Sequence, residues 1–428
     1  MVRGYVGLLR RRGFAAFLAT QFLGALNDNL YKWTLTFLVL AGALSHASAA
    51  DASNLNRIAI LFILPSLLFS GLAGWLADNF DKRTVLVASK SCEILVMGLA
   101  WLALRSGDFN LLLGVLFLLA TQFTFFSPAK YSVVPELVDA DEISLANGLL
   151  EMSTFLAILL GSALAGPLYQ RFARDLDSVA LILLGLAVLG SALSLGIAHG
   201  RTPGRRTRLW SREGAGGPAE KGILGLLQRS AAWQGNRLLR SDRLLWPANL
   251  GAAYFWFQGA LLQLLAVLLA RQVLQLDEVG IARMGMAMAI GVGAGSLLCG
   301  RLSGPGIRLA FAPVGALGMA LASAAMALAA RQASSLVLPA LAVLGVCAGF
   351  FVVPLNATLQ QRAEAGAKGR AQAAANIYST LAMIAAALSV DLLSAVLGLP
   401  ADAILLASAG LSLVMAAWLW ARGGEFRP

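Results

Sequence analysis

Residues 14–44 read FAAFLATQFLGALNDNLYKWTLTFLVLAGAL, an almost continuous apolar run. About 20 mostly apolar residues are enough to span a bilayer, so this run predicts a transmembrane helix. Four polar side chains interrupt its centre: Asn27, Asp28, Asn29 and Lys32. A charge at this depth is costly unless it is paired or faces a polar cavity, and residues four apart share a helix face suited to an ion pair. We therefore expect either a structural ion pair or, as we favour, a functional site inside the membrane.

The composition extends this expectation to the whole chain. Of 428 residues, 58% are apolar and 13% are charged, and the mean hydropathy is +0.75, as in a polytopic membrane protein. Apolar runs can be read at roughly 14–44, 56–77, 84–104, 109–127, 143–168, 178–199, 244–270, 279–300, 306–330, 334–358, 370–396 and 401–421. The sequence therefore predicts an all-α membrane protein with twelve transmembrane helices.

The placement of Lys and Arg predicts the orientation. Cytoplasmic segments carry an excess of these residues, and a cytoplasmic N-terminus assigns 25 of the 33 to that side, Lys90 and Lys130 included, against seven on the other. We expect both termini to be cytoplasmic. The net charge of +11 then reflects this bias and attraction to anionic lipids. Because the charge is scattered along short loops, no nucleic-acid partner is expected.

The spans divide six and six around the polar stretch 200–243. We predict an N-terminal half at 1–200, a basic cytoplasmic linker at 201–243 and a C-terminal half at 244–428. The segment Phe22-x-Gly24-Ala25-Leu26 recurs as Phe257-x-Gly259-Ala260-Leu261. In this alignment Gln263 occupies the position equivalent to Asp28. Parallel six-helix repeats with a midplane site between them are one transporter architecture. The linker itself can form an amphipathic helix on the headgroups or a flexible tether.

The loop after the second span reads GWLADNFDKR from Gly74 to Arg83. It resembles the G-x-x-x-D-x-x-x-[KR]-[KR] signature of the major facilitator superfamily. That resemblance implies a major facilitator fold in which the glycine permits close helix approach and the acid and basic pair latch neighbouring helix ends. The residues with this expected gating role are Gly74, Asp78, Asp81, Lys82 and Arg83. The equivalent loop, Gly300 to Ser303, lacks the acid, so a weaker latch is expected there.

Further blocks resemble the bacterial lysophospholipid transporter family. They are QFLGALNDN at 21–29, SPAKY at 127–131, PEL at 135–137, ANGL at 146–149 and GFFVVPLN at 349–356. The resemblance implies flippase movement of lysophospholipids, chiefly lysophosphatidylethanolamine, from the outer to the inner leaflet, where an acyltransferase/acyl-carrier-protein synthetase re-acylates them. The closest likeness is to modules fused to that enzyme. Since residues 1–428 carry no such domain, we expect a separate enzyme partner and a monomeric transporter.

Two groups of residues carry the expected mechanism. In our hypothesis Lys32 receives the phosphate and Asp28 the ammonium of a zwitterionic headgroup, while the acyl chain stays in an apolar groove between the halves. Further substrate-binding candidates are Asn27, Asn29, Gln263 and Glu151. Family members carry an Arg where Gln263 stands here. Lys130, Asn356 and Gln360, at the cytoplasmic helix ends, are candidates for gating or headgroup release, and a lipid-anchoring role for Lys130 is an equal alternative.

Other functions remain open at this point. The main alternative is a proton-coupled exporter of amphipathic drugs with Asp28 as proton carrier, which would require a proton gradient. A lipid receptor that does not transport is a third possibility. An enzyme is not expected, because His46 and His199 are the only histidines and no nucleophile motif or metal cluster accompanies them. No cofactor is expected.

Overall fold

The computed structural model describes residues 4–40, 42–45, 52–172, 175–198, 231–275, 278–304, 306–332, 335–364 and 366–422. His46, His199 and residues 201–230 of the predicted linker lie outside these ranges. The described chain is almost entirely helical, as the apolar runs predict.

The first group of helices precedes the linker. It comprises α1 (Tyr5–Arg10), α2 (Arg12–Leu40), α3 (Ala52–Asn79), α4 (Lys82–Ser106), α5 (Phe109–Leu137), a short 3-10 turn (Ala140–Glu142), α6 (Ile143–Phe172) and α7 (Leu176–Ser194).

The second group follows the linker. Helix α9 (Ala231–Ser241) comes first, then α10 (Leu245–Leu268), α11 (Glu278–Leu302), α12 (Phe311–Arg331), α13 (Val337–Arg362), α14 (Lys368–Asp391) and α15 (Ala401–Ala421). Short π-helical turns extend α10 over Leu269–Val273 and α14 over Leu392–Val396. The helix over Ala231–Ser241 favours the amphipathic alternative for that part of the linker.

Twelve of the described helices are long, and ten of them are apolar enough to cross a membrane. The other two, α2 and α10, have 29 and 24 residues but carry polar side chains in their interiors. These two helices open the two groups. The predicted all-α membrane fold is confirmed.

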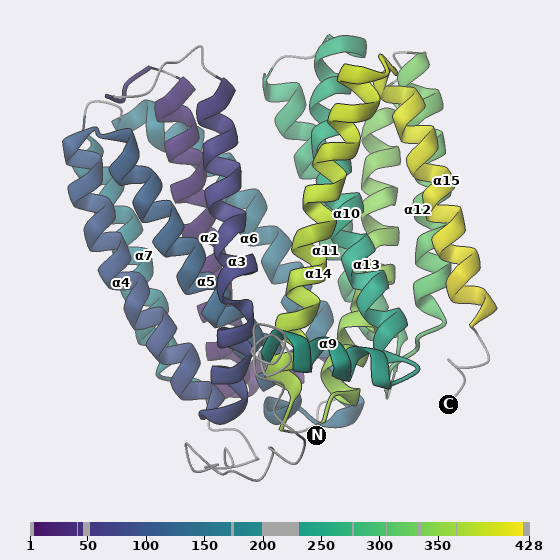
Figure 1. The fold of residues 1–428 in the computed structure, drawn as a ribbon, viewed down its shortest axis with the longest axis horizontal. Helices are drawn as coiled ribbons and strands as arrows, with labels where there is room; N and C mark the ends of the chain where they lie inside the picture. Colours follow the sequence, from purple (N-terminus) through teal and green to yellow (C-terminus); the bar gives the residue numbers. More distant parts are fainter. Residues whose placement is uncertain are drawn as a thin grey trace, which may run out of the picture.

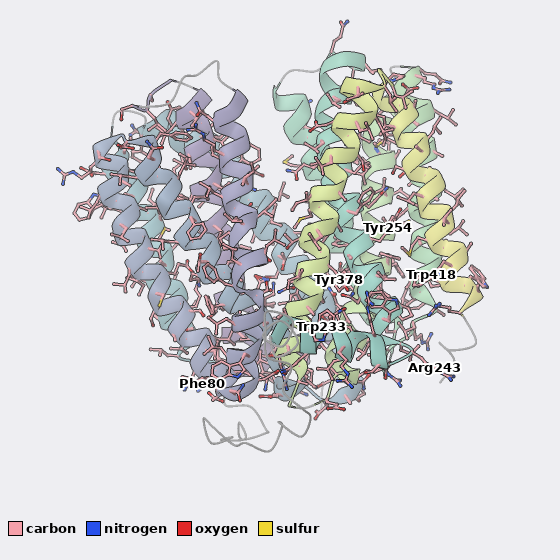
Figure 2. All side chains as sticks on the ribbon, in the orientation of Figure 1. Phe80, Trp233, Arg243, Tyr254, Tyr378 and Trp418 are labelled. Carbon is pink, nitrogen blue, oxygen red and sulfur yellow. The ribbon has the colours of Figure 1, made fainter. Side chains whose placement is uncertain are left out.

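Each group has its own apolar core. In the first, Leu35, Met97 and Leu116 are buried together, and in the second, Leu265 and Leu341. Large apolar side chains on the outer helix faces are instead exposed, among them Leu95, Leu102, Leu321 and Val414. Side chains project outward around both groups in Figure 2. Such an apolar exterior suits contact with lipid.

The two groups meet at one end and diverge toward the other, as Figure 1 shows. We call the end that carries Asp78, Arg370 and α9 the latch end. Hydrogen bonds between the groups cluster there and extend inward as far as Ser66 and Thr380, whose hydroxyls lie 3.0 Å apart. The conformation is thus closed at the latch end.

Candidate functional site

A small polar cavity lies inside the first group, between α2, α4 and α5. Its lining comprises Gln21, Gly24, Ala25, Asp28, Lys90, Glu93, Gln122, Phe123, Phe126 and Lys130. The cavity volume is about 10 Å³, which is room for about one water molecule. The cavity therefore gathers two acids and two lysines around very little space.

Asp28 also faces this cavity. Its side chain is buried, and its Oδ1 accepts no hydrogen bond from the described residues. A buried polar group left unsatisfied costs about 1–3 kcal/mol, more if it is charged. Gln21, which precedes Asp28 on α2 and also lines the cavity, has a hydrogen-bond partner, because its Nε2 donates to Thr154 Oγ1 at 2.7 Å. Of the two acids that line the cavity, Asp28 is thus the one with a carboxylate oxygen that accepts no hydrogen bond from the described residues, and it is the acid that the sequence analysis selects.

Lys90 and Glu93 form a buried ion pair beside Asp28. Both side chains are 1% exposed, and Asn27 Nδ2 donates to Glu93 Oε1 at 2.9 Å. Gly24 makes room for the lysine, since a Cβ there would lie 2.7 Å from its Nζ. The sequence analysis is wrong about Lys90, which it counts as a loop residue. A signal was available: two opposite charges three residues apart within the apolar run 84–104.

Lys130 is also buried and not at a cytoplasmic surface. Its side chain lines the cavity, with Nζ 4.9 Å from the ring centre of Tyr131. No acid in the described part of the chain forms an ion pair with it within 4.0 Å. The expected position of Lys130 at the helix end is therefore wrong. Lys130 and Asp28, the two charged side chains of the cavity without direct partners among the described residues, both line this cavity.

The other candidates on α2 and α10 lie elsewhere in this conformation. Lys32 Nζ lies 5.1 Å from the ring centre of Phe62, and no ion pair between Lys32 and Asp28 occurs among the described residues. Asn29 Nδ2 donates to Ala25 O of its own helix at 2.8 Å. Gln263 is exposed on α10. The structure thus brings only Asn27 and Asp28 of these five to the Lys90–Glu93 pair.

Glu151 links the two groups. Its Oε1 accepts from Asn356 Nδ2 of α13 at 2.9 Å, and Tyr131 contacts the same carboxyl group. One turn nearer the latch end, Asn147 Nδ2 donates to Gln360 Oε1 at 2.9 Å and Gln360 Nε2 donates back to Asn147 Oδ1 at 2.7 Å. Asn356 and Gln360 therefore join α13 to α6, a position suited to gating.

Asp78 holds α3 to α14. Its Oδ1 accepts from Gly369 N at 2.6 Å, and its Oδ2 accepts from Arg370 N and Nε at 3.1 and 2.8 Å. The carboxylate thus caps the first turn of α14, where negative charge is favourable. Gly74 lies against the same helix, because a Cβ there would lie 2.6 Å from Ala373 Cβ. No local pattern identifies Arg370 as the partner of Asp78.

The rest of the motif acts within the first group. Asp81 caps α4 by accepting from Thr84 N at 2.9 Å, and Lys82 forms an ion pair with Glu136 of α5. Arg83 Nε donates to Ile197 O, just beyond α7, at 2.7 Å. Lys82 and Arg83 thus hold α4 to its neighbours, while Asp81 stabilises the start of α4 itself.

The equivalent end of the second group has no acid in its loop. There Tyr5 OH donates to Leu297 O, and Ser144 Oγ donates to Gly306 O at 2.9 Å. A Cβ at Gly300 would lie 2.9 Å from Ser144 O, so α11 and α6 also approach closely. Neutral hydrogen bonds replace the charged latch at this contact.

Twelve long helices in two groups, joined by a charged latch at one end, define a transporter of the major facilitator class. The sequence model of the Major Facilitator Superfamily matches residues 17–387, which is most of the chain. The human organic anion transporter MFSD10 has the same fold, with a TM-score of 0.73 and 16% identity over 96% of this chain and 99% of that one.

Two sequence relatives narrow the class. A Citrobacter koseri protein named lysophospholipid transporter LplT is 30% identical over 96% of both chains. A Klebsiella pneumoniae (strain 342) protein of the same name is 28% identical over 97% of both chains. The chain belongs to the lysophospholipid transporter family of the Major Facilitator Superfamily, as the sequence blocks predict.

The buried pair can be tested through stability. Glu93→Gln leaves Lys90 buried without its acid, and loss of one member of a buried ion pair costs about 3–5 kcal/mol. We expect a marked fall in the apparent melting temperature, measured by heating in detergent followed by size-exclusion chromatography. The double variant Lys90→Met/Glu93→Leu removes both members of the pair together and should recover most of the loss. A double variant as unstable as Glu93→Gln would contradict the pairing.

The latch can be tested through accessibility. Ser127 is 5% exposed and its Oγ accepts from Asn376 of α14 at 2.9 Å, so it becomes accessible when the latch end opens. In a protein without native cysteines but with Ser127→Cys, Asp78→Asn removes a charge-assisted bond worth about 1.5–3 kcal/mol. Maleimide labelling should rise about tenfold or more. Asp81→Asn, whose bonds stay within one group, is the matched control. Equal labelling of both variants would argue against the latch.

Proposed function

We propose that this protein moves lysophospholipids, chiefly lysophosphatidylethanolamine, from the outer to the inner leaflet of the bacterial inner membrane. The family relationship along almost the full chain supports this substrate class. The single observation that carries the proposal is the cavity with Asp28 and Lys130, which lack direct partners.

The charges of the cavity match a zwitterion. Asp28 and Glu93 balance Lys90 and Lys130, so the site as a whole is close to neutral. A headgroup with one ammonium and one phosphate can give Asp28 a donor and Lys130 an acceptor without adding net charge to the interior. Charge-assisted hydrogen bonds of this kind are roughly twice as strong as neutral ones. In this proposal Lys130 takes the phosphate-binding role that the sequence assigns to Lys32.

The headgroup needs more room than this conformation offers. Space for about one water molecule cannot hold a phosphoethanolamine group, so binding requires a conformation in which the space beside Asp28 and Lys130 is larger. Rocking of the halves 1–200 and 244–428 about a midplane site between them is the movement we propose, as in other transporters with internal repeats. Gln263 of α10 would approach the headgroup during that movement.

The orientation follows from the Lys and Arg bias. We propose that the latch end is cytoplasmic, with both termini on that side, so this conformation is closed toward the cytoplasm. Lysolipid would then enter sideways from the outer leaflet while its chain stays in apolar surroundings. A monomer and a separate acyltransferase/acyl-carrier-protein synthetase complete the proposal.

The direct test is movement of labelled lysophosphatidylethanolamine between the leaflets of proteoliposomes, with and without a proton gradient. We expect exchange without a gradient and its loss in Asp28→Asn. Asn29→Ala, whose side chain bonds only its own helix, is the control and should retain exchange. Exchange that occurs only with the gradient would favour the drug exporter instead, and normal exchange in Asp28→Asn would refute the headgroup assignment.

Lys130 and Lys32 make a second comparison. Loss of one charge-assisted contact, about 1.5–3 kcal/mol, corresponds to roughly a ten- to hundredfold weaker apparent affinity. We expect Lys130→Gln to weaken lysolipid binding by this amount and Lys32→Gln to change it little. Binding is measured from the concentration dependence of transport in the same vesicles. The reverse order of effects would restore Lys32 as the phosphate ligand.

A further inference from the structure

Helix α9 lies across the latch end, perpendicular to the long helices in Figure 1. It contacts α3 of the first group and α10 and α14 of the second. It is therefore the part of the described linker that touches both groups. These two sets of contacts differ in kind.

Contacts with the second group are close and polar. Asn236 Oδ1 accepts from Tyr378 OH at 2.7 Å, and Gln234 accepts from the Arg370 guanidinium. Tyr378 and Trp233 mark this region in Figure 2. At Gly235 a Cβ would lie 2.2 Å from Arg370 O, so the α9 backbone rests directly on α14. Leu239 is fully buried in the core of the second group.

The contact with the first group includes an approach between small apolar residues. A Cβ at Gly71 of α3 would lie 3.2 Å from Ala232 Cβ, a contact between small residues. Ala232 also borders an apolar groove formed with Leu68, Leu72 and Ile377. This surface can separate without leaving a buried charge behind.

Arg370 connects α9 to the latch. The same guanidinium donates to Asp78 of α3 through Nε at 2.8 Å and to Gln234 of α9 through Nη1. When α3 and α14 separate, the Asp78 bond breaks, but nothing requires the α9 contacts with α14 to break. The contact of Ala232 with Gly71 must then break too.

We propose that α9 is a strap: it moves as part of the second half and rests on α3 only while the latch end is closed. Resting there adds apolar contact to the closed state and orients the Arg370 guanidinium toward Asp78. This inference rests on the opening of the latch end that the proposed transport requires, but not on the identity of the substrate.

The test locks each contact in turn in a protein whose native cysteines, Cys92, Cys299 and Cys347, are replaced by Ser. Gly71→Cys/Ala232→Cys brings two Cβ atoms within reach of a disulfide. We expect oxidation to reduce lysolipid exchange at least tenfold and reduction to restore it. The control is Asn236→Cys/Tyr378→Cys joined by a short bis-maleimide, because these side chains meet at their tips. This bridge within the second half should leave exchange unchanged.

A second measurement needs no transport. With Ser127→Cys added, the oxidised 71–232 pair should suppress labelling of the reporter at position 127, whereas Gln234→Ala, which frees α9 from Arg370, should increase it several-fold. Full labelling of the locked protein would overturn the strap, as would a block of labelling by the control bridge. Suppressed labelling in a protein that moves no lysolipid would support the strap and reject the proposed substrate.

Discussion

An ionised side chain inside a membrane needs a partner, and this constraint orders the interior of the bundle. Six charged residues of the described chain are buried as whole residues, namely Asp28, Lys82, Lys90, Glu93, Lys130 and Glu151. Lys82 and Lys90 have acids beside them, and Glu151 accepts from Asn356. Asp28 and Lys130 lack such partners and face one cavity. The free-energy cost of burying these two charges without partners is best explained if the substrate supplies the opposite charges when it binds.

Closure at the latch end relies on contacts that can be remade. The paired amides of Asn147 and Gln360 are neutral, and a typical hydrogen bond contributes only about 0.5–1.5 kcal/mol net, because water replaces it on opening. The Asp78 contact with Arg370 is charged, but the Arg370 side chain is 27% exposed and water can reach it. Modest, reversible bonds of this kind allow two conformations to remain close in free energy.

The sequence predicts the spans, the motif and Asp28, because hydropathy and short signatures are local properties. It misplaces Lys90 and Lys130, since a count of loop charges treats any lysine near a helix end as solvated. For Lys90 the count also ignores Glu93, three residues away. Helical spacing leaves open an ion pair of Asp28 with Lys32 as the alternative to a functional site, but Lys32 lies over an aromatic ring of α3. Pairings such as Asp78 with Arg370 join residues far apart in the chain, and no local pattern encodes them.

The buried charges are divided unequally between the halves, and this division bears on mechanism. All six lie on α2, α4, α5 and α6, whereas the second group meets them with neutral amides such as Asn356 and Gln360. Separating the halves therefore breaks no fully buried ion pair, because Lys90 and Glu93 travel together. Exposing an amide costs far less than exposing an unpaired charge in an apolar medium. A transporter built in this way can keep the charged side chains of its headgroup site together in one half while the other half opens and closes around them.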